Sequence, residues 1–127
     1  MSARILVIDD EDAIRKSFKL SLEDTPFVVV TAESGEKGVE LFKDEAYDLV
    51  FLDLKMPGLN GAQTLIKLRE INMSVPVYII TAFYEEYFDE LKEVQKLGLE
   101  FELLRKPIGN KEILMVTESV LESPVAG

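Results

Sequence analysis

The chain has 127 residues, with 24 acidic and 14 basic side chains, a formal net charge of −10, and no histidine, cysteine or tryptophan. This length fits one domain of ordinary size and leaves no room for a second. Without cysteine or histidine, the chain cannot form a disulfide scaffold, a zinc–thiolate site, a Ser-His-Asp triad or a phosphohistidine of its own. The excess of acid argues against direct binding of nucleic acid, because phosphate recognition needs the opposite charge.

No segment of the sequence predicts targeting or membrane insertion. The N-terminal residues run directly into a short apolar stretch that Asp9 interrupts, which is unlike a signal peptide. The longest apolar stretches span about half a dozen residues, well short of the roughly 20 that a membrane span needs. We therefore expect a cytoplasmic protein that makes no contact with a membrane.

Short apolar runs alternate with longer segments whose apolar residues recur at helical spacing. The predicted strands are 5–8, 28–30, 49–52, 77–80 and 101–104. The first predicted helix is 13–22, and the second is capped by Ser34 and carries Val39, Phe42 and Ala46 on one face. The third carries Ala62, Leu65 and Ile66 on one face, the fourth is the aromatic-rich segment 84–97, and Asn110 caps the last.

Five successive strand–helix units predict an α/β fold. Strands that read as continuous apolar runs are typical of a parallel sheet covered by helices on both faces. Right-handed crossovers then give a doubly wound (βα)5 three-layer sandwich, with a five-stranded parallel sheet in the flavodoxin-like order 2-1-3-4-5. We expect one domain over residues 1–122, with 123–127 as a C-terminal tail or the start of a linker.

Polar side chains follow the strands at their carboxyl ends, where ligands bind in such sheets. Asp9 and Asp10 follow the first strand, Asp53 the third, Thr81 the fourth and Lys106 the fifth. Taken alone, the first two acids suit the positive end of a helix dipole, and the threonine or lysine suits an ordinary strand end. Their placement together at one edge instead favours a functional site.

The chemistry of these groups favours a cation. Two carboxylates about 4 Å apart repel each other by roughly 4 kcal/mol at an effective dielectric constant near 20. Such a pocket either protonates one carboxyl group or recruits a positive ion, and an all-oxygen ligand set favours Mg²⁺. A metal ion and a lysine beside a carboxylate are suited to phosphoryl transfer onto that carboxylate.

Four motifs occur in order along the chain: Asp9-Asp10, Asp53 followed by Met56-Pro57-Gly58 and Gly61, Thr81-Ala82, and Lys106-Pro107. Together they resemble the receiver domain of two-component response regulators (CheY-like), over nearly the whole chain. The resemblance implies Mg²⁺-dependent transfer of a phosphoryl group from a phosphohistidine of a sensor histidine kinase or histidine phosphotransferase, and a conformational signal to an output domain or downstream protein. It implies no enzyme activity on external substrates.

The resemblance also implies a role for each pocket residue. Asp53 would be the phospho-acceptor, and Thr81 and Lys106 would each bind a phosphoryl oxygen. The metal ligands would be Asp53, Asp10 directly, Asp9 through water or as an outer carboxylate, and the backbone carbonyl of Lys55. The Lys106-Pro107 peptide bond would be cis, although X-Pro bonds in general favour trans.

The sequence departs from the family three residues before the active-site lysine. The family usually has Tyr or Phe there, and the ring moves inward on activation, whereas this chain has Leu103, with Phe101 two residues earlier. We expect the aromatic switch to be missing; the alternative is an irregular last strand in which Phe101 serves.

Residues around the predicted pocket suggest how it is regulated. Lys55 and Phe83 lie two residues beyond the acceptor and the threonine, and we expect them to hinder attacking water and slow dephosphorylation. Ile14, Arg15 and Phe18 are candidate neighbours of the phosphodonor, with core packing the preferred role for Phe18. In the fourth helix, we expect Phe88 and Leu91 to enter the core, while Tyr84 and Tyr87 form either core or a partner or homodimer face.

The main alternative function is a pseudo-receiver, a phosphorylation-independent protein-interaction module. Leu103 in place of the aromatic favours this reading, and the complete acidic pocket argues against it. A flavodoxin-like electron carrier would share the strand order, but the acidic run from Asp9 to Asp12 would repel a flavin phosphate.

Overall fold

The computed structural model describes residues 2–121, so the predicted tail 123–127 lies outside the described residues. The chain forms one parallel sheet in the order β2-β1-β3-β4-β5, which confirms the predicted order. The strands are β1 (Arg4–Ile8), β2 (Val28–Ala32), β3 (Leu49–Asp53), β4 (Val77–Thr81) and β5 (Glu102–Arg105).

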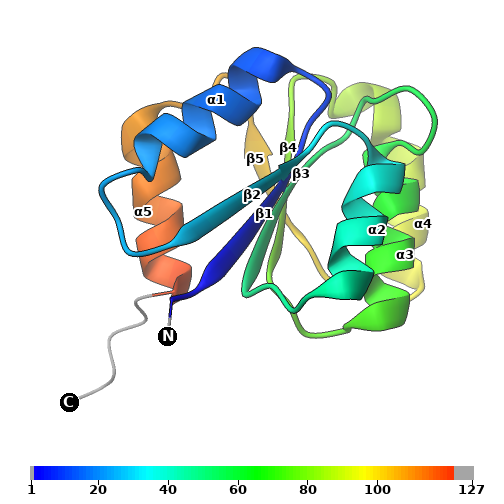
Figure 1. Ribbon diagram of the computed structural model, residues 1–127. Coiled ribbons are helices and arrows are strands. Elements are labelled where there is room, and N and C mark those ends of the chain that lie inside the picture. Colours follow the sequence, from blue (N-terminus) through cyan, green and yellow to red (C-terminus); the bar gives the residue numbers. More distant parts are fainter. Residues whose placement is uncertain (1, 122–127) are drawn as a thin grey trace.

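Helices cover both faces of this sheet and complete the predicted three layers (Figure 1). Two of them, α1 and α5, lie together on one face, and α2, α3 and α4 lie on the other. None of the described helices is long and apolar enough to cross a membrane. The helices are α1 (Asp12–Ser21), α2 (Gly35–Asp44), α3 (Gly61–Ile71), α4 (Phe88–Lys96) and α5 (Asn110–Leu121), with a short 3₁₀ helix η1 (Glu85–Tyr87) before α4.

Alternate residues of the central strands face opposite sides of the sheet, so the chain has two apolar cores. Leu6 and Ile8 pack under α2, α3 and α4, whereas Ile5 and Val7 pack under α1 and α5. Phe18 of α1 is fully buried in the second core, as expected, with its ring centroid 4.7 Å from that of Phe51. The central strands are therefore covered on both faces.

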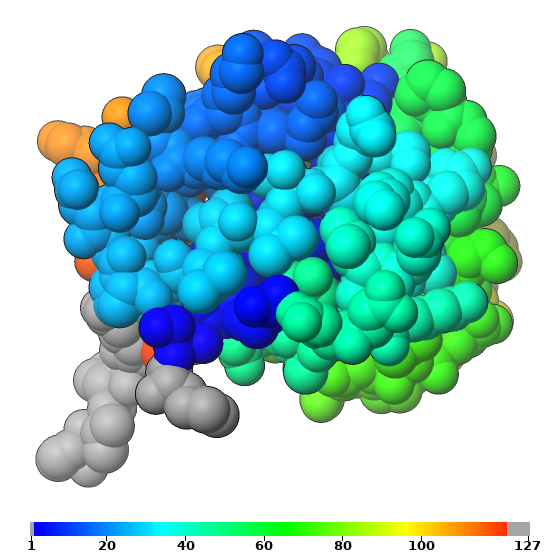
Figure 2. Space-filling model, viewed as in Figure 1, coloured from blue at the N-terminus to red at the C-terminus, as the bar shows by residue number. Residues whose placement is uncertain are grey.

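The two edge strands are less buried than the continuous apolar runs suggested. Val28 of β2 is 39% exposed, and β5 begins and ends with exposed residues. In Figure 2, viewed as in Figure 1, side chains of the β2 region fill the space between α1 and α2. The expectation of strands buried on both faces thus holds for β1, β3 and β4.

Three details of the predicted helices are wrong. The second helix ends at Asp44, and Ala46 lies beyond it and is exposed, although Ser34 caps its start as predicted. The fourth is a 3₁₀ turn followed by α4, and Phe88 at the junction is 41% exposed because its ring packs on Tyr84 rather than on the sheet. Asn110 is the first residue of α5, and its side-chain oxygen accepts a hydrogen bond from the Ser21 hydroxyl of α1.

Candidate functional site

Three carboxylates meet where the strand order reverses. Asp9 directly follows β1, Asp10 comes next, and Asp53 ends the neighbouring strand β3. One oxygen from each lies within 4.8 Å of the others. Asp9 and Asp53 are buried, and Asp10 is exposed. The predicted acidic cluster therefore forms, at the predicted edge of the sheet.

Hydrogen bonds hold the loop between β1 and α1 in place. The Asp9 N–H donates to the Ala32 carbonyl at 3.1 Å, and Asp9 Oδ1 accepts the Glu11 N–H at 2.9 Å. Arg15 of α1 donates from Nη1 to the Asp9 carbonyl at 2.6 Å and from Nη2 to Asp12 Oδ1 at 3.2 Å. The sequence indicated Arg15 as a candidate neighbour of the phosphodonor. In the structure it also holds the acidic loop in place.

A close approach of α3 fixes the loop that follows Asp53. The Gly61 N–H donates to the Leu54 carbonyl at 2.8 Å, and a Cβ on Gly61 would lie 2.4 Å from the Asp53 carbonyl oxygen, so only glycine fits. Asn60 and Gln63 form a reciprocal capping box at the start of α3. Asp53 Oδ1 accepts the Leu54 N–H at 2.9 Å, which orients the carboxylate.

Lys106 places a positive charge beside this cluster. Its Nζ lies 3.2 Å from Asp9 Oδ2, 3.2 Å from Asp53 Oδ1 and 2.8 Å from Glu11 Oε1, with only 12% of the side chain exposed. Its backbone N–H donates to the Thr81 carbonyl at 2.9 Å, which ties the residue to the end of β4. The Lys106-Pro107 peptide bond is cis, as the resemblance implied.

Burial and like charge dominate the electrostatics of the pocket. Burial, followed by repulsion from Asp9, raises the pKa of Asp53 to about 7. Burial also raises the pKa of Asp9. For Lys106, burial lowers the pKa, but the hydrogen bond to Glu11 and the charges of Asp53 and Asp9 outweigh it, so the pKa is raised. The carboxylates therefore lack full compensation from the lysine.

The donor set fits a hard divalent cation. Asp9 Oδ2 is buried and accepts no hydrogen bond from the described residues, although Lys106 lies near it. A buried anionic oxygen that lacks a hydrogen bond is costly, and a cation would compensate its charge. All three candidate side-chain ligands are carboxylates, the chemistry that Mg²⁺ prefers.

A hollow of about 630 Å³ opens above the cluster. Thr81 is buried at the end of β4, and its Oγ accepts the Phe83 N–H at 2.7 Å, which leaves the hydroxyl proton free to donate. The hollow thus combines a charged floor with an apolar wall. Asp10, Asp53 and Lys106 contribute to its charged part, and Met56, Pro57, Phe83 and Tyr87 to its apolar part, with Glu11 and Lys55 completing the lining.

Lys55 and Phe83 lie against each other at the mouth of this hollow. The Lys55 Nζ lies 4.4 Å from the Phe83 ring centroid and 3.3 Å from Glu86 Oε2. Phe83 is 46% exposed, so this cation–π pair is a partly exposed structure at the rim. Its effect on the lifetime of a phosphoryl group stays a prediction.

The fifth strand is regular. Leu103 pairs with Ile79 in an unbroken parallel register, and Phe101 lies just before the strand. Both side chains are half-buried against the core under α2, α3 and α4. This regularity does not support the alternative in which an irregular strand brings Phe101 to the position of Leu103.

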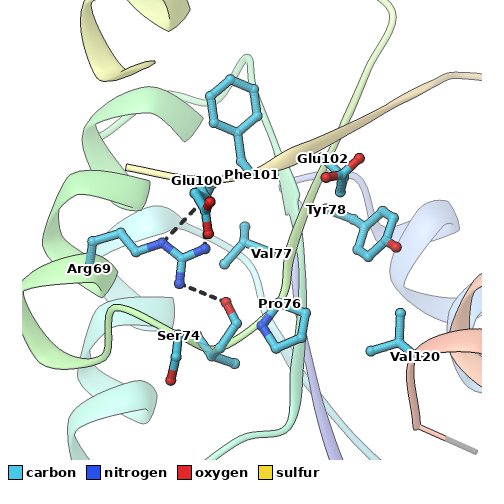
Figure 3. Close-up of a pocket in the computed structure, with 10 residues that line it drawn as sticks. Arg69, Ser74, Pro76, Val77, Tyr78, Glu100, Phe101, Glu102 and Val120 are labelled. Carbon is cyan, nitrogen blue, oxygen red and sulfur yellow. Dashed lines mark hydrogen bonds between the residues drawn. The ribbon is translucent and has the colours of Figure 1, made fainter. Parts of the chain in front are cut away.

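A second hollow, of about 320 Å³, lies at the opposite, amino-terminal end of β4 and β5 (Figure 3). Arg69 of α3 reaches into it and is 4% exposed. Its guanidinium donates to the carbonyls of Glu100, at 2.6 Å, and Val75, at 2.6 Å, and burial lowers its pKa. Arg69 is therefore satisfied by backbone oxygens and joins α3 to the segment before β5.

The contact between Glu11 and Lys106 in the pocket was not predicted from the sequence. Glu11 counted only as part of an acidic run, because its neighbours in the chain give no sign of a lysine 95 residues away. The available signal was its position in the loop after β1, at the same edge of the sheet as Lys106.

Comparison with known proteins gives one consistent family. The model of the response regulator receiver domain matches residues 5–118. The alkaline phosphatase synthesis transcriptional regulatory protein PhoP of Bacillus subtilis is 32% identical over 124 residues, which cover 95% of this chain and 49% of PhoP. The transcriptional regulatory protein SrrA of Staphylococcus aureus is 33% identical over 95% of this chain and 48% of SrrA. The chain spans about half the length of these relatives.

Solved structures agree with this family. A response regulator receiver domain protein from Clostridium thermocellum is 32% identical, covers 95% of each chain and superposes with a TM-score of 0.79. The chemotaxis protein CheY4 of Vibrio cholerae is 25% identical and superposes with a TM-score of 0.81, over 95% of this chain and all of that one.

Proposed function

The chain belongs to the response regulator receiver domain family, and we propose that it accepts a phosphoryl group from a phosphohistidine onto Asp53. The observation that carries this proposal is the buried Asp53 carboxylate held between two further carboxylates and the Lys106 ammonium. The donor is a sensor histidine kinase or a histidine phosphotransferase, since receiver domains pair with histidine kinases and this chain has no histidine.

The two oxygens of Asp53 differ in their contacts. Oδ1 accepts the Leu54 N–H and faces Lys106, whereas Oδ2 accepts no hydrogen bond from the described residues. We assign the attack to Oδ2, because its lone pairs are not engaged by these donors. A new oxygen–phosphorus bond forms, the phosphorus–nitrogen bond of the donor breaks, and its electron pair returns to the imidazole nitrogen.

The remaining pocket residues stabilise the transferred group. Lys106 donates to one phosphoryl oxygen. Thr81 Oγ still accepts the Phe83 N–H, while the Thr81 hydroxyl proton is donated to another phosphoryl oxygen. Asp9, Asp10, Asp53 and the Lys55 carbonyl would hold Mg²⁺, which supplies positive charge to the phosphoryl oxygens when bound. The proposal includes no reaction on an external substrate.

The consequence of phosphorylation is a signal to a partner. We propose that an output domain or a downstream protein reads the modified state. Because Leu103 occupies the position of the family's aromatic, this signal depends on groups other than an inward-moving ring. Tyr84 and Tyr87 are both half-buried, and Tyr87 lines the hollow over the site. Both stay candidates for a partner or homodimer face.

Intact mass spectrometry tests the proposal directly. The protein is incubated with Mg²⁺ and acetyl phosphate, beside an Asp53→Asn variant that keeps the size of the side chain. We expect one phosphoryl group on the wild type and none on the variant. Absence of any mass gain, also with a panel of phosphorylated histidine phosphotransferases, would contradict the proposal and favour the pseudo-receiver. Equal gain by both proteins would move the acceptor to another residue.

A further inference from the structure

Three carboxylates share one ammonium group in this pocket. An ammonium carries three protons, and Lys106 Nζ faces Asp9, Asp53 and Glu11. The shortest of the three contacts, at 2.8 Å, is to Glu11, and it is the one with hydrogen-bond geometry. The lysine that must bind the phosphoryl group is therefore already held by another partner.

These three partners differ in their freedom to leave. Asp9 is fully buried, and its other oxygen is held by the Glu11 N–H. Asp53 is the residue that is itself modified in the proposed reaction. Glu11 is different, because 59% of its side chain is exposed and water can solvate its carboxylate if the lysine leaves.

We propose that Glu11 is a positioning residue that holds Lys106 before phosphorylation and must release it for transfer, so that Glu11 slows the acceptance of a phosphoryl group. This inference rests on the proposed function of Asp53. Glu11 also lines the hollow through which the donor would approach. Its negative charge therefore opposes transfer twice, by occupying an ammonium proton and by repelling the anionic donor.

Kinetics of mass gain test this role. The rate of mass gain with acetyl phosphate is measured for wild type, Glu11→Gln and the control Asp12→Asn. Each protein is assayed at its own saturating concentration of Mg²⁺. Asp12 follows Glu11 directly as the first residue of α1, and its substitution removes the same charge, but it pairs with Arg15 and Lys16 rather than Lys106. We expect Glu11→Gln to react about threefold to fivefold faster than both other proteins, because a factor of this size corresponds to the free energy of a partly exposed ion pair. A rate equal to that of Asp12→Asn, or slower than wild type, would overturn the proposal.

The pairing itself has a readout that needs no phosphorylation. Reductive methylation with labelled formaldehyde reports the access of reagent to each lysine amine, measured by peptide mass spectrometry. We expect Lys106 to be methylated several-fold faster in Glu11→Gln than in wild type, relative to the exposed Lys43 as an internal reference. Unchanged methylation of Lys106 would show that Glu11 does not hold it and would overturn the inference.

The two experiments separate this inference from the proposed function. If wild type takes up a phosphoryl group while Glu11→Gln matches the control, only the role of Glu11 is wrong. If no protein takes up a phosphoryl group from any donor, the proposed function fails, and the gating role of Glu11 fails with it even when methylation confirms the pairing.

Discussion

Replacing Asp53 by asparagine should stabilise the protein, by an amount that grows with pH. The pKa of Asp53 is raised from 3.8 to about 7 by burial and by Asp9. Between these two values the folded state binds more protons than the unfolded state, so stability falls as pH rises. A pKa difference of about 3 between the folded and unfolded states lowers the free energy of unfolding by about 4 kcal/mol once the pH exceeds 7. Rearrangement of Lys106 offsets part of this, and we expect a gain of about 2–4 kcal/mol at pH 8.

Urea denaturation followed by far-ultraviolet circular dichroism measures this gain. The experiment is done in EDTA, so that no divalent cation relieves the repulsion, at several values between pH 4.5 and pH 8. The free energies of unfolding of wild type and Asp53→Asn should converge toward the acid end and separate toward the alkaline end.

An exposed carboxylate provides the matched control. Asp12→Asn removes the same charge at an exposed position whose pKa is lowered, chiefly by Lys16, so its loss should not stabilise the protein at high pH. Parallel pH curves for wild type and Asp53→Asn would refute the reasoning. They would mean that Lys106 fully compensates the carboxylates, and that the pocket has no electrostatic need for a cation.

Three further predictions follow from the same geometry. Adding Mg²⁺ at 100 times the dissociation constant of the wild type should raise its free energy of unfolding by about 2.7 kcal/mol. Asp10→Asn should gain less at the same Mg²⁺ concentration, as measured in a series of thermal melts. Phe83→Ala should speed the loss of the phosphoryl group after the donor is removed, because the ring that packs on Lys55 is lost; an unchanged half-life in the mass assay would count against a barrier to water. Gly61→Ala should destabilise the protein by about 1–3 kcal/mol in urea, since its methyl group would meet the Asp53 carbonyl.

The sequence was sufficient for the sheet order and for the acidic cluster. Apolar runs such as 49–52 and the alternation with helical segments leave few topologies, and right-handed crossovers then put the ends of β1 and β3 side by side. Asp9 and Asp10 follow β1, and Asp53 ends the neighbouring strand β3, so the three carboxylates meet. This part of the site depends on topology alone.

Helix ends and exposure were less predictable. Phe88 is a large apolar residue of the kind that fills cores, yet it lies partly exposed at the junction of the 3₁₀ turn and α4, where it contacts Tyr84 and the Lys92 ammonium. Similarly, Ala46 continued the helical spacing of α2, but the helix ends two residues earlier. Periodicity carries no information on where a backbone changes its turn type, because tertiary contacts decide this.

The position of Lys106 shows why contacts in the pocket needed the structure. Its strand is separated from β1 by β3 and β4, three inter-strand spacings or about 14 Å, which exceeds the reach of a side chain along the sheet. The contact forms because the residues on both sides lie beyond the ends of β5 and β1, so that the side chain of Lys106 and those of Asp9 and Glu11 extend toward each other. Topology therefore selects which residue types share an edge, while the loops and long side chains beyond the strands select which of them touch. Glu11 and a phosphoryl group would compete for the Lys106 ammonium through contacts of this second kind, made beyond the strand ends. Testing Glu11 therefore tests whether such contacts control the chemistry of the residues that topology brings together.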